Sequence, residues 1–362
     1  MKAVQDLGGH LTLEDLKNHM ELGSEPTEPL YLRYRGQNVG SKTEGGKNSD
    51  SQGINVWEHP PNGQGIVALM ALGILESLEK TGKIRTFTPA DHNSAEYLHA
   101  VIEALKLAFG DATWFVTDPS TTPVPTSSLL SPDYLASRAT LFNPSKADPS
   151  LFPHGSPGHQ SSDTVYFAVT DRHGNACSFI NSLYGQFGTG IIPPGTGFAL
   201  QNRGANFSLD PGHPNAYAGG KRPYHTIIPA MVTNPDGTLN SVLGVMGGFM
   251  QPQGHVQVLL NMMVFGMDPQ KALDAPRFCI GAGTPESGEV LGRVFLEEGI
   301  ADDVVERLGI GEGGLGHDVV VIRGWDRERF GRGQVIRCHY DGGRVVYSAG
   351  SDPRGDGGAF PV

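Results

Sequence analysis

The sequence predicts an α+β protein in which antiparallel strands and helices form packed layers. Two long helical segments in the first half, residues 65–79 and 98–109, are rich in apolar side chains at helical spacing. The second half contains several short β-branched and aromatic runs separated by turn residues, including a clear hairpin over 164–183. Strands of this kind bury their apolar face against helices, so we expect helices on both faces of the sheet.

Composition excludes several classes of protein. The 362 residues are enough for one large hydrophobic core or two modest ones, and a net charge of −11 argues against a nucleic-acid-binding or anionic-membrane surface. The densest basic segment, Arg323 to Arg332, is interrupted by acidic residues and is interpreted as a solvated hairpin. Cys177, Cys279 and Cys338 are too few and too far apart for a disulfide framework or a zinc site, and we expect them to be buried.

The sequence as given favours a soluble protein. It lacks any apolar run near the ~18 residues that a membrane helix needs, and its first twenty residues are too polar for a secretory signal. No signal peptide is visible, and the sequence leaves the compartment unknown. Neither a cofactor nor a metal is expected, because His213 and His225 have no companion at ligand spacing.

The first part of the chain predicts helices with one strand and one insertion. Thr12 is expected to introduce a helix over 11–20, and a strand follows over 30–39. The polar segment 41–52 is interpreted as a loop insertion. The apolar segment 65–79 predicts a buried helix, and Leu98 to Phe109 predicts an amphipathic one.

A Pro/Ser/Thr/Gly-rich stretch from 118 to 160 is typical of a surface linker, with a short helix near 132–142. After the linker we expect a series of strands and then a helix from about 253 to 265. The strands are predicted at 164–170, 176–183, 197–202, 225–233 and 241–246.

The hairpin places a threonine beside a serine. Asp171 to Asn175 supply the turn, so pairing Thr170 with Ala176 sets Thr164 opposite Ser182 on the same face, about 5 Å apart at Cβ. A threonine hydroxyl becomes a nucleophile when a base lies beside it, and a free α-amine on the same residue is one such base. Most threonines in such runs simply begin a strand, so the hairpin alone favours that structural role.

Several motifs in order resemble the γ-glutamyltranspeptidase family, a branch of the N-terminal nucleophile hydrolases. In the second half they are Ser161-Ser162-Asp163-Thr164, Asp171-x-x-Gly174-Asn175-Ala176, Phe187-Gly188-Thr189-Gly190-Ile191, Lys221-Arg222-Pro223, Met246-Gly247-Gly248, Ala275-Pro276-Arg277 and Gly350-Ser351-Asp352-Pro353-Arg354-Gly355-Asp356-Gly357. In the first half they are Gly8-Gly9-x-Leu11-Thr12-x-x-Asp15-Leu16 and Pro60-Pro61-Asn62-Gly63-Gln64-Gly65. The match extends over nearly the whole chain.

The resemblance implies a four-layer αββα sandwich that lacks part of the family's N-terminal portion, which supplies sheet strands and a carboxylate-binding arginine. It also implies a zymogen cleaved between Asp163 and Thr164 into 1–163, the large-subunit remainder, and 164–362, the β-rich catalytic half. The two fragments are expected to stay associated as one composite domain.

The same resemblance implies roles for individual residues. Thr164 is the expected nucleophile and Ser182 orients it. Gly247 and Gly248, between an apolar run and a helix, are expected to stabilise the oxyanion, although such a glycine pair is also common in plain strand-to-helix turns.

The predicted substrate-binding segment departs from the family. Asn206 stands where an aspartate normally binds the α-amino group, and Tyr224-His225-Thr226 replaces the serine pair that follows Lys-Arg-Pro. Tyr184 stands where an asparagine is usual. His225 is interpreted as a neutral donor to a carboxylate or as a pH-sensitive contact; a histidine hydrogen-bonded within a strand is an equally good interpretation.

These departures resemble members that hydrolyse other amides, such as cephalosporin-acylase-like and oxamate-amidohydrolase-like proteins. The sequence therefore predicts a self-processing threonine amidohydrolase or acyltransferase for small amides, γ-glutamyl compounds included, with a link to glutathione metabolism but weak activity on glutathione itself. The alternative is a folded, uncleaved and non-catalytic homologue that acts as a structural or binding protein. A conventional Ser/His hydrolase is disfavoured, because the chain has no Gly-x-Ser-x-Gly motif.

Overall fold

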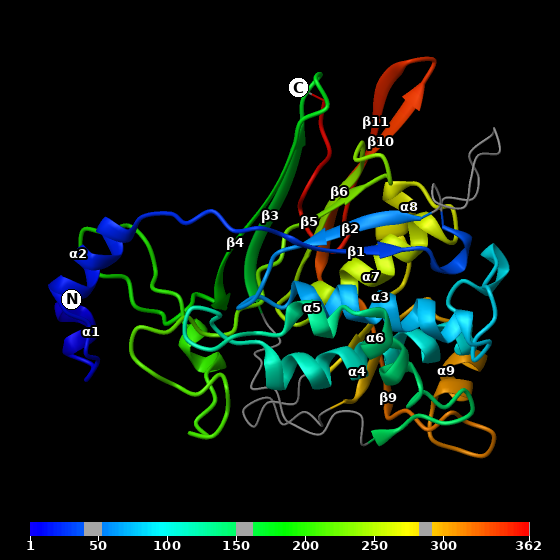
Figure 1. The fold of residues 1–362 in the computed structure, drawn as a ribbon, viewed down its shortest axis with the longest axis horizontal. Coiled ribbons are helices and arrows are strands. Elements are labelled where there is room, and N and C mark those ends of the chain that lie inside the picture. The colour runs from blue at the N-terminus through cyan, green and yellow to red at the C-terminus, as the bar shows by residue number, and fades with distance from the viewer. Residues whose placement is uncertain (40–52, 150–161, 282–291, 362) are drawn as a thin grey trace.

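A six-stranded antiparallel sheet forms the centre of the computed structural model, which describes residues 1–39, 53–149, 162–281 and 292–361 (Figure 1). Its strands lie in the order β1-β2-β5-β6-β10-β11. Their bounds are β1 Leu30–Tyr34, β2 Ile54–Glu58, β5 Ala230–Thr233, β6 Leu239–Met246, β10 Arg332–Asp341 and β11 Arg344–Ser351. The sheet therefore combines two strands that precede the predicted cleavage point with four that follow it.

Two different layers cover the two faces of this sheet. Gly244 and Val245 are neighbours on β6, so their side-chain directions point to opposite faces. Gly244 lies under the ring of Tyr166 from the hairpin β3 (Ser162–Thr170) and β4 (Ala176–Gly185), because a Cβ at Gly244 would lie 2.3 Å from that ring. Val245 instead packs against Gly254 of α7 (Met250–Met263). The hairpin and the helices thus lie on opposite faces of β6.

The helical side is two helices deep. Helix α3 (Gly65–Lys80) contacts β1, β2 and α7, and α4 (Ala95–Phe115) packs on α3 rather than on the sheet. The amphipathic pattern predicted for 98–109 is incomplete, because α4 also buries His99, Glu103 and Lys106. Helix α6 (Pro132–Ala139) also packs on α3, and its Leu135 fills the space beside Gly73. The core lies between these helices and the sheet.

The predicted helices on both faces of the sheet are not found within the described ranges. There the hairpin covers the second face of the sheet, and its own outer face is open: Val165, Phe167 and Val169 are 45–63% exposed. Phe167 stacks on Phe179 of β4, with ring centroids 4.9 Å apart. The described layers are therefore hairpin, sheet and helices, and the four-layer sandwich remains a prediction.

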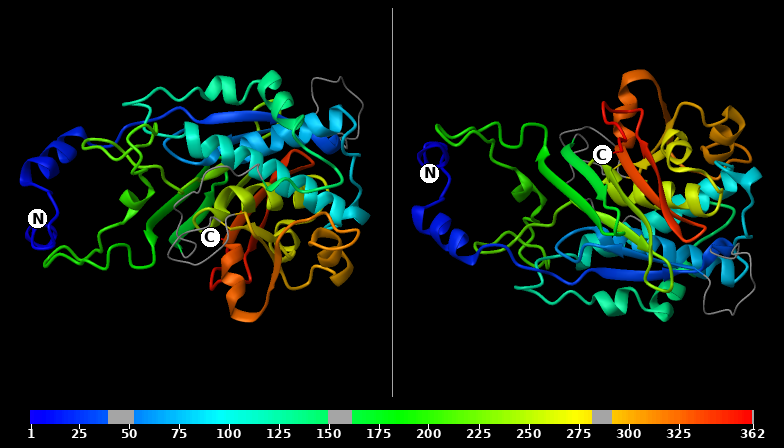
Figure 2. Two further views of the ribbon diagram at one scale, coloured as in Figure 1. Left: turned by 90° about the horizontal axis from the view of Figure 1, so that it is seen from below. Right: turned by 90° about the horizontal axis from the view of Figure 1, so that it is seen from above.

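The remaining elements extend the chain around this centre. A smaller sheet of the described chain contains β7 (Phe278–Ile280), β8 (Val294–Glu297) and β9 (Val319–Ile322), with β8 and β9 parallel. The other helical elements are α1 Lys2–Gln5, α2 Leu13–Leu22, η1 Gly36–Asn38, η3 Pro89–Asp91, α5 Thr126–Leu129, η5 Arg203–Asn206, α8 Pro269–Asp274, α9 Asp302–Leu308 and η6 Gly324–Phe330. Helices α1 and α2 project from the body of the molecule beside the long connection that follows β4 (Figure 2). Within the described ranges, no helix is both long enough and apolar enough to span a bilayer.

Most helix predictions are confirmed and several strand bounds are wrong. Thr12 caps α2 through a capping box with Asp15, as predicted. Residues 197–202 form no strand, since Leu200 makes only two backbone hydrogen bonds, to Thr189 and Ile191, within an irregular loop. The predicted strand 30–39 ends at Tyr34 and the predicted strand 225–233 begins only at Ala230. The predicted loop 41–52 lies outside the described residues.

Two surface interpretations also need correction. The basic segment Arg323 to Arg332 contains the 3₁₀ helix η6 between strands of different sheets, not a hairpin. Cys177 is exposed, because it lies on the open face of β4, whereas Cys279 and Cys338 are buried as expected.

A buried ion network joins two of the sequence motifs that are far apart in the chain. Arg277 is fully buried and donates to Asp352, with 2.6 Å between Nη2 and Oδ2. Arg354 binds the other oxygen of Asp352 and also pairs with Glu297. Burial alone would raise the pKa of Asp352, but the two guanidinium charges and backbone N–H donors lower it on balance. The C-terminal segment is thereby attached to α8 and β8.

We expect Asp352→Asn to destabilise the fold by about 3–5 kcal/mol, because it leaves the buried guanidinium of Arg277 without its paired carboxylate and removes one of the two carboxylates that bind Arg354. Since the folded-state pKa of Asp352 lies below its unfolded value, this contribution is complete above about pH 4 and is lost as the pH falls. Urea unfolding at pH 7 and at pH 3 measures both effects.

Lys271→Gln is the matched control, because Lys271 and its partner Asp268 are exposed. It should change the free energy of unfolding by less than ~1 kcal/mol. An equally small effect of Asp352→Asn at pH 7 would contradict the structural role of the network.

Candidate active site

Thr164 and Ser182 lie opposite each other on adjacent strands. The predicted pairing is confirmed, since Thr170 pairs with Ala176 and the register continues to Thr164 and Ser182. Thr164 is only 2% exposed and donates from Oγ1 to Ser182 Oγ over 3.1 Å. A buried hydroxyl with a fixed hydrogen-bond direction is oriented in the way that a nucleophile requires.

A β-bulge lies directly across the strand from the predicted scissile bond. The register shifts between Asp163, which pairs with Tyr184, and Thr164, which pairs with Ser182. Leu183 is the extra residue, and Tyr184 adopts a positive φ of 80°. Bulges of this kind redirect side chains, and here the N–H of Tyr184 donates to Ser182 Oγ over 2.8 Å. The bulge thus turns Tyr184 inward and fixes the serine that contacts Thr164.

Hydrogen bonds connect the predicted substrate-binding residues to one another. Tyr184 donates its hydroxyl to Asn206 Oδ1 over 2.6 Å. Asn206 Nδ2 then donates to the carbonyl of Tyr224 over 2.9 Å. Both bonds are buried, so the structure brings together three residues that are up to 40 positions apart in the sequence.

Gln64 continues this connection to the glycine turn. It accepts from the Tyr224 hydroxyl over 3.2 Å and donates to the carbonyls of Thr226 and Gly248, over 3.1 and 2.8 Å. No role was predicted for Gln64, although it belongs to the motif Pro60-Pro61-Asn62-Gly63-Gln64-Gly65. Its position just before the long apolar helix α3 was the available signal, because a buried amide there must find partners.

The predicted oxyanion glycines form the turn between β6 and α7. Gly247 and Gly248 have φ of 128° and 61°, which only glycine adopts without strain. Their carbonyls accept the N–H groups of Met250 and Gln251 in the first turn of α7. The turn is thus fixed from both sides, by helix α7 and by Gln64.

His225 and Thr226 lie beside the same turn. His225 is partly buried. Its backbone N–H donates to the carbonyl of Asn62, and its Nδ1 is buried with no hydrogen-bond partner among the described residues. Burial, followed by the charges of Arg203, His59 and Arg222, lowers the pKa of His225 to about 3. His225 is therefore neutral near pH 7, and the structure gives no support for a pH-sensitive contact in the physiological range.

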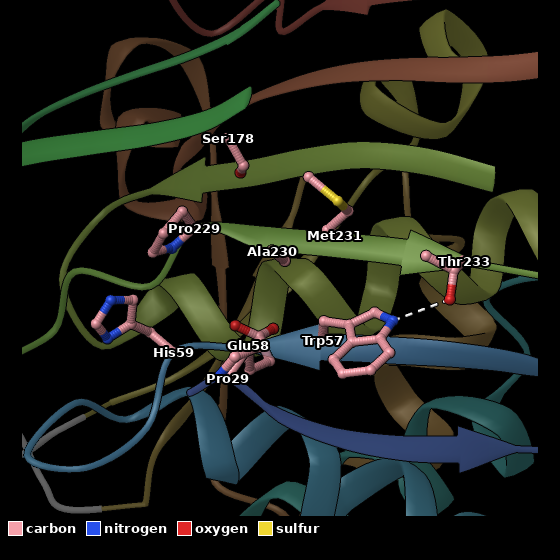
Figure 3. Close-up of a pocket in the computed structure, with 9 residues that line it drawn as sticks. All are labelled: Pro29, Trp57, Glu58, His59, Ser178, Pro229, Ala230, Met231 and Thr233. Atoms are coloured by element: carbon pink, nitrogen blue, oxygen red, sulfur yellow. Dashed lines mark hydrogen bonds between the residues drawn. The ribbon is translucent and has the colours of Figure 1, made fainter. Parts of the chain in front are cut away.

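A separate pocket of about 280 Å³ opens beside β2, β4 and β5. Figure 3 shows the carboxylate of Glu58 inside it, between His59 and Trp57, and the hydrogen bond from Trp57 to Thr233. The pocket contains none of the predicted site residues, and Ser178 on its wall is four residues, or about 13 Å, along β4 from Ser182. His255 binds Glu58 from behind, through Nδ1 at 2.7 Å.

One buried cluster in the described chain has metal-ligand residue types. His99, Glu103 and His317 offer ligand atoms within 4.8 Å of one another. The ammonium of Lys106, however, lies 3.0 Å from Glu103 Oε1 and 3.4 Å from His317 Nδ1. Burial lowers the pKa of both histidines, and Lys106 lowers that of His317 further. A cation already contacts two of the three candidate ligands, so the residues fit a neutral histidine pair with an ion pair better than a metal site.

Comparison with known proteins identifies the family. The family model of γ-glutamyltranspeptidase matches residues 1–362. The chain is 34% identical over 359 residues to the glutathione hydrolase-like YwrD proenzyme of Bacillus subtilis, covering 99% of this chain and 60% of that protein. It is also 34% identical over 353 residues to the oxamate amidohydrolase proenzyme of Klebsiella pneumoniae, a match that covers 98% of this chain and 58% of that protein.

Among solved structures, the chain resembles the cephalosporin acylase from Bacillus halodurans. The identity is 39%, the TM-score is 0.75, and the match covers 97% of this chain and 55% of that one. The chain therefore spans less than two thirds of the length of these relatives. Hydrolases and acylases of this kind are the divergent members that the sequence predicts.

We expect Gln64→Leu to destabilise the protein by on the order of 3 kcal/mol, because it leaves the Tyr224 hydroxyl and the carbonyls of Thr226 and Gly248 buried without partners. Urea unfolding measures the change. Gln5→Leu, which removes an exposed amide in α1, is the control and should shift the free energy of unfolding by less than ~0.5 kcal/mol. Equal effects of the two substitutions would contradict the importance of the buried connection.

Proposed function

Because the chain belongs to the γ-glutamyltranspeptidase family, we propose that it is a self-processing threonine amidohydrolase or acyltransferase acting on small amides. The supporting observation is the hydrogen bond between Thr164 and Ser182, at one end of a hydrogen-bonded path that reaches Gly248. A nucleophile, an orienting hydroxyl and a glycine turn are the parts that acyl transfer needs.

In the first stage, Thr164 Oγ1 attacks the carbonyl carbon of Asp163. The peptide C–N bond breaks, an ester forms on Oγ1, and the released amine takes up the proton. Water then hydrolyses the ester and leaves a carboxylate on Asp163 and a free α-amine on Thr164. The bulge opposite this bond supports the assignment, because local irregularity favours a distorted and reactive peptide.

In the second stage, the α-amine of Thr164 acts as the base, since such amines titrate near ~8. Oγ1 attacks the substrate amide, the backbone N–H groups of Gly247 and Gly248 stabilise the oxyanion, and the leaving amine departs with the proton. Water or another amine then attacks the acyl ester and regenerates Thr164. Ser182 keeps the hydroxyl of Thr164 directed toward the substrate throughout.

The two fragments, 1–163 and 164–362, remain together because they share one sheet. Strand β2 of the first fragment pairs with β5 of the second, and β1 pairs with β2. Separating them would expose α3, whose apolar residues belong to the common core. We propose that they form one composite domain, and that the open face of the β3–β4 hairpin faces the fourth layer of the complete sandwich.

The substrate is an amide other than glutathione, on which activity is weak. Asn206 carries no charge to attract a substrate ammonium group, and its oxygen and nitrogen already bind Tyr184 and Tyr224. The relatives named as an oxamate amidohydrolase and a cephalosporin acylase support small amides as the substrate class. Tyr224, His225 and Thr226 form the wall of the acyl pocket in this proposal.

Thr164→Ala should abolish self-cleavage. We expect the parent protein to separate into masses that correspond to 1–163 and 164–362, while the variant stays intact. Thr170→Ala, at the other end of β3, is the matched control and should cleave like the parent. Intact mass spectrometry after prolonged incubation makes the comparison, and a parent that stays whole would favour the non-catalytic alternative.

Ser182→Ala should slow both cleavage and turnover by about 10- to 100-fold without abolishing them, because it removes the partner of Thr164 Oγ1 but leaves the nucleophile. Ser182→Thr keeps the hydroxyl and should retain most activity. The measurements are the cleavage rate and kcat/KM on a chromogenic amide. Equal losses of activity in Ser182→Ala and Ser182→Thr would contradict the role of the hydroxyl and show that the size of the side chain at 182 controls activity.

A further inference from the structure

Arg203 places a buried positive charge among the predicted substrate-binding residues. It begins η5, is 6% exposed, and donates from Nη1 to Thr226 Oγ1 over 3.2 Å. Its guanidinium carbon lies 5.5 Å from the ring centroid of Tyr184. The residue therefore contacts both the wall of the proposed acyl pocket and the tyrosine that fixes Ser182.

The described residues leave part of this guanidinium unsatisfied. Nη2 is buried and has no hydrogen-bond partner, and no described carboxylate pairs with Arg203. The other deeply buried arginines behave differently, because Arg277 and Arg354 both bind Asp352. A buried cation without a counter-charge is unfavourable, so a fold that keeps one is adapted to receive an anion from outside.

Arg203 keeps its charge under ordinary conditions. Burial lowers the pKa of its guanidinium to about 10, and the interaction with Tyr184 opposes that shift. The group is therefore protonated near pH 7. The nearby His225 is partly buried and has a buried Nδ1 with no partner; it is neutral near pH 7 and can donate a hydrogen bond without adding charge.

The position of Arg203 connects it to the nucleophile through two residues. The ring of Tyr184 lies beside the guanidinium, the backbone N–H of Tyr184 donates to Ser182 Oγ, and Ser182 accepts from Thr164. Arg203 is therefore joined to the nucleophile by a chain of only two residues, Tyr184 and Ser182.

We propose that Arg203 is the specificity-determining residue of this site, and that it binds a carboxylate carried by the acyl group of the substrate. The planar guanidinium suits a carboxylate because its N–H groups match the two oxygens. This inference rests on the proposed function for its catalytic readout, but carboxylate binding can be tested without turnover. The substrate class is the monoamide of a short dicarboxylic acid.

The activity test compares succinamate, which carries a carboxylate, with butyramide, which does not. The parent should prefer succinamate, and Arg203→Met should lower the ratio of kcat/KM for succinamate to kcat/KM for butyramide at least 100-fold. Arg203→Lys should recover part of the preference. Equal losses on both substrates, or no loss on succinamate, would overturn the proposal.

The binding test uses succinate and the melting temperature. The parent should be stabilised by succinate in a saturable manner, and Arg203→Met should not respond. Without ligand, Arg203→Met should melt at the same or a higher temperature than the parent, because it removes an uncompensated buried charge. A lower melting temperature in every condition would identify Arg203 as a structural residue and overturn the proposal.

Arg222→Met is the matched control, because Arg222 is also near His225 but is half-exposed and already paired with Glu25. It should keep the succinate response. Saturable stabilisation of the parent but not of Arg203→Met, in a chain that never cleaves, would support the inference and refute the proposed function. If the chain cleaves itself and turns over neutral amides, but a carboxylate changes neither its activity nor its melting temperature, the proposed function is supported and the role of Arg203 is refuted.

Discussion

The hydrogen bond from Thr164 to Ser182 depends on the register of the β3–β4 hairpin, and the rest of the site depends on that bond. A slip of one residue would turn Thr164 to the open face, where its neighbour Val165 is 63% exposed. The inward face is held because Tyr166 packs on Gly244, a position where any side chain would collide with its ring. Packing between the hairpin and β6 thus keeps Thr164 buried and oriented.

The bulge at Leu183 lets Tyr184 form hydrogen bonds with both Ser182 and Asn206, and so connects the hairpin to the predicted substrate-binding residues. Without the extra residue, Tyr184 would follow the regular alternation and its N–H would not reach Ser182 Oγ. With it, the buried side chain of Tyr184 reaches Asn206. Residues from both parts of the chain then contribute, because Gln64 belongs to the first and Gly248 to the second. The site therefore requires the shared sheet to stay intact after any cleavage.

Charge is distributed differently in the site and in the scaffold. Arg277, Arg354, Asp352 and Glu297 form a compensated network under the C-terminal segment. The predicted acyl pocket, by contrast, contains one buried cation, neutral histidine and several hydroxyl and amide groups. Buried charges that are paired, as in the network, stabilise the fold. A buried charge without a partner lowers stability, and we expect it to be retained where a ligand supplies the opposite charge.

The features that could be predicted from the sequence are those that depend on local residue patterns, such as the hairpin register, and on the order of motifs, such as the family. Turn chemistry at 171–175 and alternation along 164–170 were enough to pair Thr164 with Ser182, and the capping box at Thr12 is local as well. The family motifs predicted the family correctly. The prediction of a strand over 197–202 was wrong, because the segment makes only scattered backbone hydrogen bonds, from Leu200 to Ile191 and from Asn202 to Leu183 of β4, and these do not continue into a ladder.

Other features could not be predicted from the sequence, because they depend on contacts between distant segments. Gln64 and Arg203 are ordinary polar residues in the sequence, and only the fold buries them beside Thr226. Helix α4 looked amphipathic, but α9 and α3 cover it, so that His99 and Glu103 became buried partners of His317. Tertiary burial of polar side chains has no signal in local periodicity.

The most direct test is the amino-terminal sequence of the C-terminal fragment after self-cleavage, read by tandem mass spectrometry. We expect this fragment to begin Thr164-Val165-Tyr166, with a free amine on Thr164. A fragment that begins at any other residue would contradict the assignment of Thr164 as the nucleophile. So would a processed protein that keeps full amidase activity after the α-amine of Thr164 has been blocked.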